Sequence, residues 1–207
     1  MPIFTKDDTT VLFIHIPKAA GTSIEHILVE NGFAISYRRG GVYGPLNEFD
    51  RENGCSPQHL HAELLEKHLG DRKFSKIFTI VRHPIHRFAS EYRFRVDSQH
   101  PLAADGINTF CEKALNRFKR NPFVLDNHIR PQVEFPWRGC TVFKLEDGME
   151  TVLDTLSEEL PDPLLSDGVP AMRSLTKVAA DLTPYNKRRL FEFYKADFEA
   201  YGYSYDW

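Results

Sequence analysis

Two short apolar runs each lead directly into a helix-like stretch. The run Val11–Ile16 precedes a stretch over 22–32 that suits a helix and ends at an Asn-Gly pair. The run Lys76–Val81 precedes a helix expected over 84–95, whose first residue is a proline, as the first helical position tolerates. Continuously apolar runs of this length are typical of strands buried on both faces. Each pair therefore predicts a buried strand that feeds a helix.

The rest of the chain repeats this alternation. A third short strand is expected over Thr141–Leu145, and the remaining predicted helices cover 57–69, 107–118, 150–160 and 184–201, the last with Thr183 as its N-cap. Short strands that alternate with longer helices predict an α/β fold of three layers, a central parallel sheet flanked by helices. In such sheets, ligands bind at the carboxyl ends of the strands.

Length and composition narrow the class of protein. The 207 residues suit a single domain, 1–207, and 42% hydrophobic with 27% charged residues is ordinary for a globular protein. A net charge of −3 argues against binding a nucleic-acid polymer. Neither a signal sequence nor a transmembrane segment is expected, and the three cysteines have no metal-site or redox spacing, so a cytoplasmic protein with reduced thiols is favoured.

The loop after the first predicted strand has the composition of an anion site. It reads P-K-A-A-G-T-S, and its members are Pro17, Lys18, Ala19, Ala20, Gly21, Thr22 and Ser23. Small residues let an anion approach the backbone, the start of the helix offers unpaired N–H groups, and Lys18 adds a full charge. A plain strand-to-helix turn with a surface lysine is the alternative. A Walker A loop places its lysine after the second glycine, whereas Lys18 precedes Gly21, so the sequence does not match an ordinary P-loop NTPase. The fold is still expected to be P-loop-like.

A second candidate anion site follows the second predicted strand. Arg82 leaves that strand and Ser90 lies on the next helix. A guanidinium can donate two hydrogen bonds to a phosphate, and a hydroxyl can add another. Because both loops are expected at the same edge of the sheet, together they predict a ligand with two phosphate-like groups.

The two loops as a pair resemble those of the sulfotransferases. P-K-A-A-G-T-S is similar to their 5′-phosphosulfate loop, and R-x-P-x-x-R-x-x-S, from Arg82 to Ser90, is similar to their 3′-phosphate motif. The resemblance implies that the donor is 3′-phosphoadenosine 5′-phosphosulfate (PAPS), that the product is 3′-phosphoadenosine 5′-phosphate (PAP), and that no metal is needed. The form of the first loop is similar to the carbohydrate branch of the family, as found in soluble bacterial-type members, which implies a hydroxyl of a carbohydrate or glycoconjugate as acceptor.

Other stretches fit this branch. D-N-H-I-R-P-Q, from Asp126 to Gln132, resembles the H-x-R-P-Q stretch of chondroitin-type enzymes, which implies acceptor contacts by His128, Arg130 and Gln132. Basic residues before the last helix, Arg173 with Lys177, are expected to close over the 3′-phosphate, as in related enzymes.

Sulfuryl transfer needs a group that stabilises the leaving phosphate and a base for the acceptor hydroxyl. Lys18 is the candidate for the first role. For the second, Q-H-L-H-A offers His59 and His61, with His61 ranked slightly ahead because the resemblance to heparan-type enzymes includes an L-H-A sequence. Two other functions stay open from the sequence. They are a nucleotide kinase or NTPase with an atypical phosphate loop, and a PAP-binding module without activity.

Overall fold

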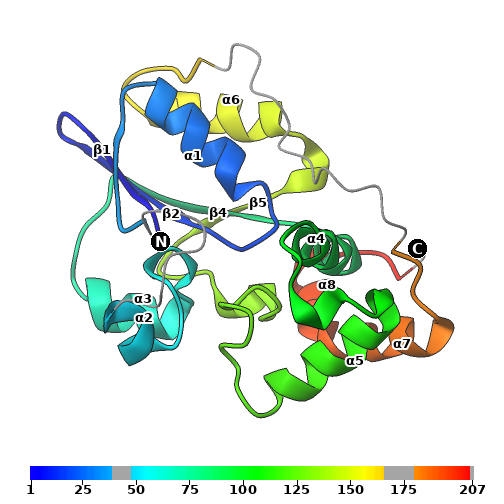
Figure 1. Cartoon of the computed structure of the whole chain (residues 1–207). Coiled ribbons are helices and arrows are strands. Elements are labelled where there is room, and N and C mark those ends of the chain that lie inside the picture. Colours follow the sequence, from blue (N-terminus) through cyan, green and yellow to red (C-terminus); the bar gives the residue numbers. More distant parts are fainter. Residues whose placement is uncertain (39–47, 166–179, 206–207) are drawn as a thin grey trace.

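A computed structural model describes residues 1–38, 48–165 and 180–205, and its centre is a five-stranded sheet (Figure 1). The strand order is β3-β1-β2-β4-β5. β2, β4 and β5 are parallel, which confirms the three predicted strands and their direction. The strands are β1 (Ile3–Lys6), β2 (Thr9–Ile14), β3 (Ala34–Ser36), β4 (Lys76–Val81) and β5 (Thr141–Lys144).

The sheet is mixed, so the prediction of a purely parallel sheet is wrong at one edge. β1 pairs antiparallel with both β2 and β3. The β1–β2 hairpin closes through Asp7 and Asp8, and Asp7 adopts a left-handed φ of 49°. β1 is four residues long and β3 is three, and two of the three positions of β3 are exposed. Neither strand therefore forms an apolar run that can be recognised in the sequence.

The helices occupy the predicted places with three exceptions, one of which is the unpredicted α2 (Glu48–Asn53). In the described part of the chain the α-helices are α1 (Gly21–Glu30), α2 (Glu48–Asn53), α3 (Ala62–Leu69), α4 (Pro84–Asp97), α5 (Gly106–Phe118), α6 (Met149–Glu159), α7 (Pro184–Phe193) and α8 (Lys195–Tyr201). The predicted helix over 57–69 is instead a 3-10 turn, Pro57–His59, followed by α3, because Leu60 and His61 are extended. The predicted helix over 184–201 is divided at Tyr194, although Thr183 caps it as expected.

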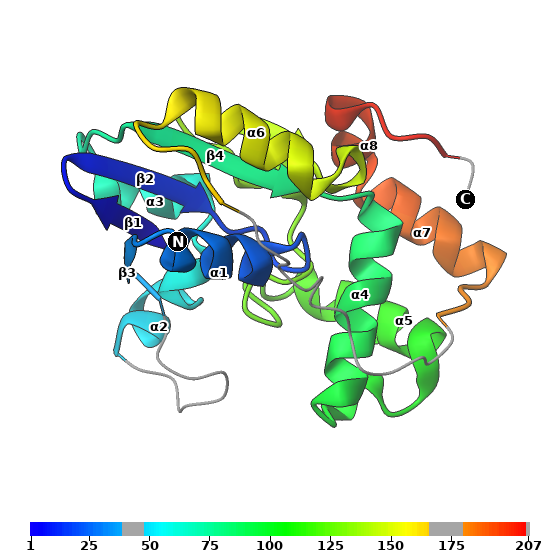
Figure 2. The same cartoon turned by 90° about the horizontal axis from the view of Figure 1, so that it is seen from above.

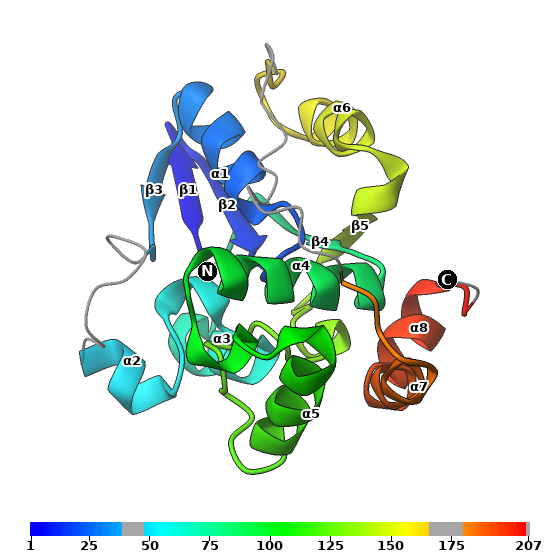
Figure 3. The same cartoon turned by 45° about the vertical axis from the view of Figure 1, so that its right-hand side comes forward.

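Helices cover both faces of the sheet, as Figures 1 and 3 show. Val11 and Phe13 of β2 point to one face and pack with α1 and α6. Leu12 and Ile14 alternate to the other face and pack with α3. Period-two alternation along one strand therefore anchors both layers, as expected for a strand buried on both sides.

A third apolar cluster lies beyond the carboxyl ends of the parallel strands. α4, α5, α7 and α8 gather there, with buried side chains such as Phe88, Phe110 and Tyr194 between them (Figure 2). This helical cluster forms one wall beside the loops that follow β2 and β4. No helix in the described ranges is long and apolar enough to cross a lipid bilayer.

Candidate functional site

The loops that follow β2 and β4 meet at one edge of the sheet, as predicted. The Arg82 guanidinium donates through Nη1 to the main-chain oxygen of Lys18 at 3.4 Å. One turn into α4, Arg87 donates to the main-chain oxygen of Pro17, also at 3.4 Å. Parallel pairing of β2 with β4 causes this meeting, because it places both carboxyl ends side by side.

The Lys18 loop, residues 17–23, has a sharply bent backbone. Lys18 and Ala20 both adopt left-handed conformations, with φ of 69° and 61°, and α1 begins at Gly21. Alternation of this kind turns successive N–H groups toward one side. The N–H groups of Gly21 and Thr22 lie at the start of the helix, whereas that of Ser23 donates to the Ala20 carbonyl at 3.0 Å. Thr22 is exposed and Ser23 is buried, while Ala19 is fully buried. The loop thus offers backbone donors together with one exposed hydroxyl.

Gly21 is required by a neighbouring side chain. A Cβ at Gly21 would lie less than 3.0 Å from three atoms of the His15 ring. His15 itself is fixed, since its Nδ1 is 2.7 Å from Glu25 Oε1. The missing side chain of this loop glycine therefore makes room for His15, a role that the spacing of the motif does not reveal.

The Lys18 ammonium points toward α4. Its Nζ lies 4.1 Å from the centre of the Phe94 ring, a cation–π contact. Burial lowers the pKa of Lys18, and the carboxylate of Glu91 partly opposes that shift. A cation held over an aromatic face, with few polar partners, is available to a negatively charged ligand.

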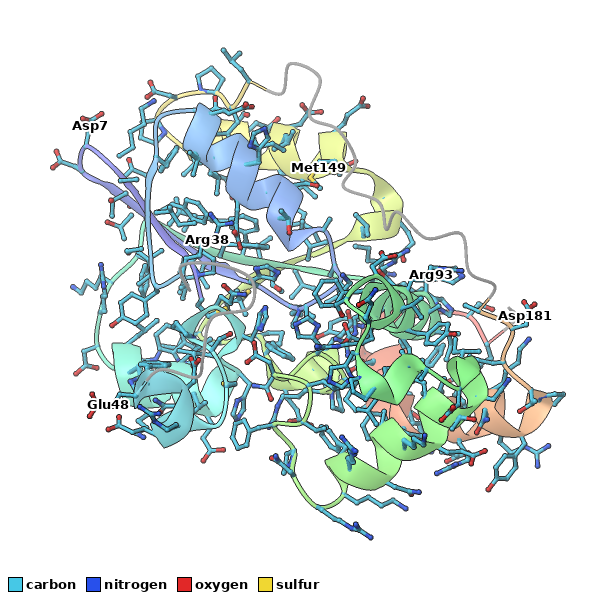
Figure 4. The ribbon with its side chains drawn as sticks, in the orientation of Figure 1. Asp7, Arg38, Glu48, Arg93, Met149 and Asp181 are labelled. Carbon is cyan, nitrogen blue, oxygen red and sulfur yellow. The ribbon has the colours of Figure 1, made fainter. Side chains whose placement is uncertain are left out.

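The side chain of Gln132 holds the main chain of Arg82 in place. The Arg82 N–H donates to Gln132 Oε1 at 2.9 Å, and Gln132 Nε2 donates back to the Arg82 carbonyl at 2.8 Å. Burial lowers the pKa of the Arg82 guanidinium, and the nearby cation Arg93, labelled on α4 in Figure 4, adds to this shift. Ser90 lies half-buried on α4, one turn before Phe94.

Three histidines form a buried row beside the Lys18 loop, each paired with a carboxylate. His15 pairs with Glu25 at 2.7 Å, His59 with Asp126 at 2.8 Å and His128 with Glu91 at 2.6 Å. The His59 ring lies edge-on to both others, with centroid distances of 5.2 Å to His15 and 4.8 Å to His128. We call these six residues the histidine cluster.

The histidine cluster adjoins the Lys18 ammonium. The Phe94 ring stacks on His128 with a centroid distance of 5.7 Å, and its contact with Lys18 is given above. Burial lowers the pKa of His128 to about 4, against the opposing effect of Glu91. Burial also lowers the pKa of His59, and Asp126 partly offsets that effect. The neutral His128 ring is thus connected to the Lys18 ammonium through the Phe94 ring, and the neutral His59 ring through His128 and Phe94.

The two candidate bases, His59 and His61, diverge. His59 ends the 3-10 turn and is only 4% exposed, inside the histidine cluster. His61 precedes α3 and contacts Phe123 and Glu63, at a ring distance of 5.7 Å and an N–O distance of 3.7 Å respectively. Leu60 and His61 are extended, and the two rings have different neighbours, since His59 contacts His15 and His128. The structure brings His59, and not His61, together with Lys18 and His128.

Arg130 and Gln132 lie in the wall behind the cluster. Gln132 is fully buried, with its amide on the Arg82 main chain. Arg130 Nε donates to Asn127 Oδ1 at 2.9 Å, and the guanidinium also pairs with Glu134. Both residues support the loops, whereas His128 faces the Lys18 side through Phe94.

Buried Arg87 ties these loops together. Its guanidinium donates to the carbonyl oxygens of His128, at 3.0 Å, and Arg130, at 2.5 Å, and lies 5.5 Å from the Tyr194 ring. The motif R-x-P-x-x-R-x-x-S therefore contains one arginine that serves as a fully buried structural donor.

Sequence reasoning missed the carboxylates of the cluster. Glu25 and Glu91 lie on helices where most carboxylates are solvated, and Arg38, labelled in Figure 4, approaches Glu25 at 3.2 Å. Asp126 was visible in D-N-H-I-R-P-Q, yet nothing local connects it to His59, 67 residues away. Arg173 and Lys177 lie outside the described residues.

Potential metal ligands also occur here. His59, Asp126 and His128 each offer one ligand atom, and the three atoms lie within 4.8 Å of one another. Two imidazoles and a carboxylate are a ligand set that zinc accepts. The geometry of the pair itself is that of a hydrogen bond, since His59 Nδ1 and Asp126 Oδ2 are 2.8 Å apart.

Two loops that carry Lys18 and Arg82 thus meet at this edge of the sheet, beside two imidazoles whose pKa is lowered by burial. The chain matches the model of the sulfotransferase family over residues 1–204. The protein therefore belongs to the sulfotransferase family, as the two loops predicted, and is a transferase that moves a sulfuryl group. Searches of curated proteins and of solved structures found no match.

Proposed function

We propose that the protein transfers a sulfuryl group from PAPS to a hydroxyl of a carbohydrate or glycoconjugate. The observation that carries this proposal is the meeting of the Lys18 loop with Arg82, at 3.4 Å, beside the histidine cluster. In a P-loop-like arrangement, the Lys18 loop binds the 5′-phosphosulfate through its N–H groups and the hydroxyls of Thr22 and Ser23. Arg82 and Ser90 bind the 3′-phosphate, with Arg173 as a further cation for that group.

Lys18 acts on the leaving group. As the bond between sulfur and the 5′-phosphate oxygen lengthens, negative charge grows on that oxygen. An ammonium whose contact among the described residues is the cation–π contact with Phe94 can follow this charge at little cost. A partly desolvated cation also interacts more strongly than one in water. No metal is required for this step, because Lys18 and the loop N–H groups supply the positive charge.

The acceptor loses its proton to a histidine. Of the two sequence candidates we favour His59, because it alone shares the histidine cluster with the side chains that lead to Lys18. Its lowered pKa keeps it unprotonated at neutral pH, as a base requires. His128 borders the expected position of the acceptor. Arg130 and Gln132 contribute by supporting the loops that carry Asn127 and Arg82.

Kinetics of four variants test these roles. With radiolabelled PAPS and a panel of oligosaccharide acceptors, Lys18→Ala is expected to lower kcat with little change in the KM for PAPS. Arg82→Ala is expected to raise that KM, and the opposite pattern would mean that the two roles are exchanged. His59→Ala should lower kcat by roughly 100-fold or more, the usual contribution of a general base. His61→Ala, the matched control two residues away, should retain most of the rate, and a larger loss there would identify His61 as the base.

Competing functions predict different ligands. A nucleotide kinase would bind ATP with magnesium and show no preference for a 3′-phosphate. A binding module without activity would bind PAP and release no sulfated product from any acceptor. The neutral base beside an intact Lys18 loop favours the enzyme over the module.

A further inference from the structure

A strained turn lies directly beside the histidine cluster. Leu125, Asp126 and Asn127 adopt left-handed conformations in succession, with φ of 58°, 59° and 62°. Asparagine and aspartate tolerate this region, but leucine rarely adopts it. Backbone strain persists where the surrounding structure enforces it, and it is concentrated at functional sites.

The turn holds His59 at both its side chain and its main chain. Asp126 Oδ2 lies 2.8 Å from His59 Nδ1, and Asn127 Nδ2 donates to the His59 carbonyl at 2.9 Å. Asn127 is fully buried. Two neighbouring residues of one strained turn thus fix a single histidine that is 67 and 68 positions away in the chain.

The Asp126 carboxylate has a defined orientation. Ser56 donates its main-chain N–H to Oδ1 at 2.6 Å and its hydroxyl to Oδ2 at 2.8 Å. Oδ1 accepts the Ser56 N–H, and Oδ2 is shared by the Ser56 hydroxyl and His59 Nδ1, so Asp126 in its ordinary ionised form accepts from both residues and His59 donates from Nδ1. The proton of neutral His59 therefore resides on Nδ1, and its Nε2 carries the lone pair.

We propose that Asp126 is the positioning residue of the reaction, which holds His59 in the tautomer whose Nε2 can accept the acceptor proton. The proposal rests on the proposed function. In the transfer step the acceptor oxygen forms its bond to sulfur while the bond to the 5′-phosphate oxygen breaks. The acceptor proton moves to His59 Nε2, Asp126 stays ionised beside the resulting imidazolium, and PAP leaves with the electron pair of the broken bond. The proton passes to water when the product is released.

Asp126→Asn gives a sharp test because the network dictates how the amide sits. The Ser56 N–H needs an acceptor, so the amide oxygen must take the Oδ1 position. The amide nitrogen then faces His59 Nδ1 and donates to it, which moves the ring proton to Nε2 and removes the base. We expect kcat to fall by roughly 100-fold to 10,000-fold, the range for inverting the tautomer of a catalytic histidine. The KM for PAPS should change less than threefold.

Nitrogen-15 NMR of the histidine side chains reports the tautomer without turnover. In the wild-type protein His59 is expected as the Nδ1–H tautomer, and in Asp126→Asn as the Nε2–H tautomer. Asp154→Asn is the matched control, because it makes the same substitution at an exposed carboxylate of α6, outside the histidine cluster. That variant should retain the Nδ1–H tautomer and a kcat within about fivefold of wild type.

The possible outcomes separate this proposal from the proposed function. An Nε2–H tautomer in the wild type, or a kcat for Asp126→Asn within threefold of wild type, would overturn the role of Asp126. Should Asp126→Asn not fold, the wild-type spectrum still decides. If the wild type binds no PAPS, the proposed function fails, yet an inverted tautomer in Asp126→Asn would still support positioning of His59 by Asp126. A purely structural role would alter stability without inverting the tautomer.

Discussion

Gly21→Ala tests whether the Lys18 loop and the histidine cluster are packed as one unit. Alanine at an ordinary helical position is more stable than glycine by about 1 kcal/mol. Here the added methyl group would overlap the His15 ring. That ring cannot turn away freely, because it pairs with Glu25 and lies between Phe13 and His59. Overpacking costs about 1 to 3 kcal/mol, and weakening of the pair with Glu25 about 1 kcal/mol more. The clash should therefore outweigh the helix propensity, with a net loss of about 2 kcal/mol.

A double-mutant cycle isolates this contact. The free energy of unfolding would be measured in urea for wild type, Gly21→Ala, His15→Ala and the double variant. Without the imidazole the methyl group has space, so Gly21→Ala should be neutral or slightly stabilising in the His15→Ala background. We expect a coupling energy of about 2 kcal/mol between the two positions. Additivity within about 0.5 kcal/mol would show that His15 does not constrain Gly21, and the steric reasoning would be refuted.

Three further predictions concern the buried charges. Arg87→Met should lower the free energy of unfolding, measured in urea, by about 3 kcal/mol, because the carbonyls of His128 and Arg130 lose a charged donor. The control Arg117→Met removes an exposed guanidinium and should change that free energy by less than about 0.5 kcal/mol. Because burial lowers the pKa of His59, kcat/KM should fall only below pH values of about 6.5, and an acid limb above that value would exclude His59 as the base. A chelator should leave the rate unchanged, and a loss restored by zinc would make His59, Asp126 and His128 a metal site.

The parallel half of the fold was predictable because its strands are apolar runs. β4 begins and ends at the predicted residues, and β2 is displaced by two positions toward the N-terminus. The antiparallel edge was not predictable in the same way. β1 is too short, and β3 is too short and too exposed, to produce a pattern. Both strands are stabilised by pairing in the sheet, which depends on residues that are distant in the sequence.

The positions of two candidate residues were predictable because each lies in the loop directly after a predicted parallel strand. Lys18 and Arg82 follow directly from motif and strand end, and the structure brings them together. The histidine cluster was not predictable as a unit, since each pair joins residues from different elements. The predicted helix over 57–69 also concealed the difference between His59 and His61, because only the extended residues Leu60 and His61 separate the directions of the two rings.

The account depends most on a donor site that binds two phosphate groups. Isothermal titration of the wild-type protein with PAP and with AMP, which lacks the 3′-phosphate, tests it directly. We predict that PAP binds at least tenfold more tightly, a difference of about 1.4 kcal/mol, and that Arg82→Ala removes most of this preference while the control Arg117→Ala retains it. Equal affinity for PAP and AMP would contradict the assignment of the two loops.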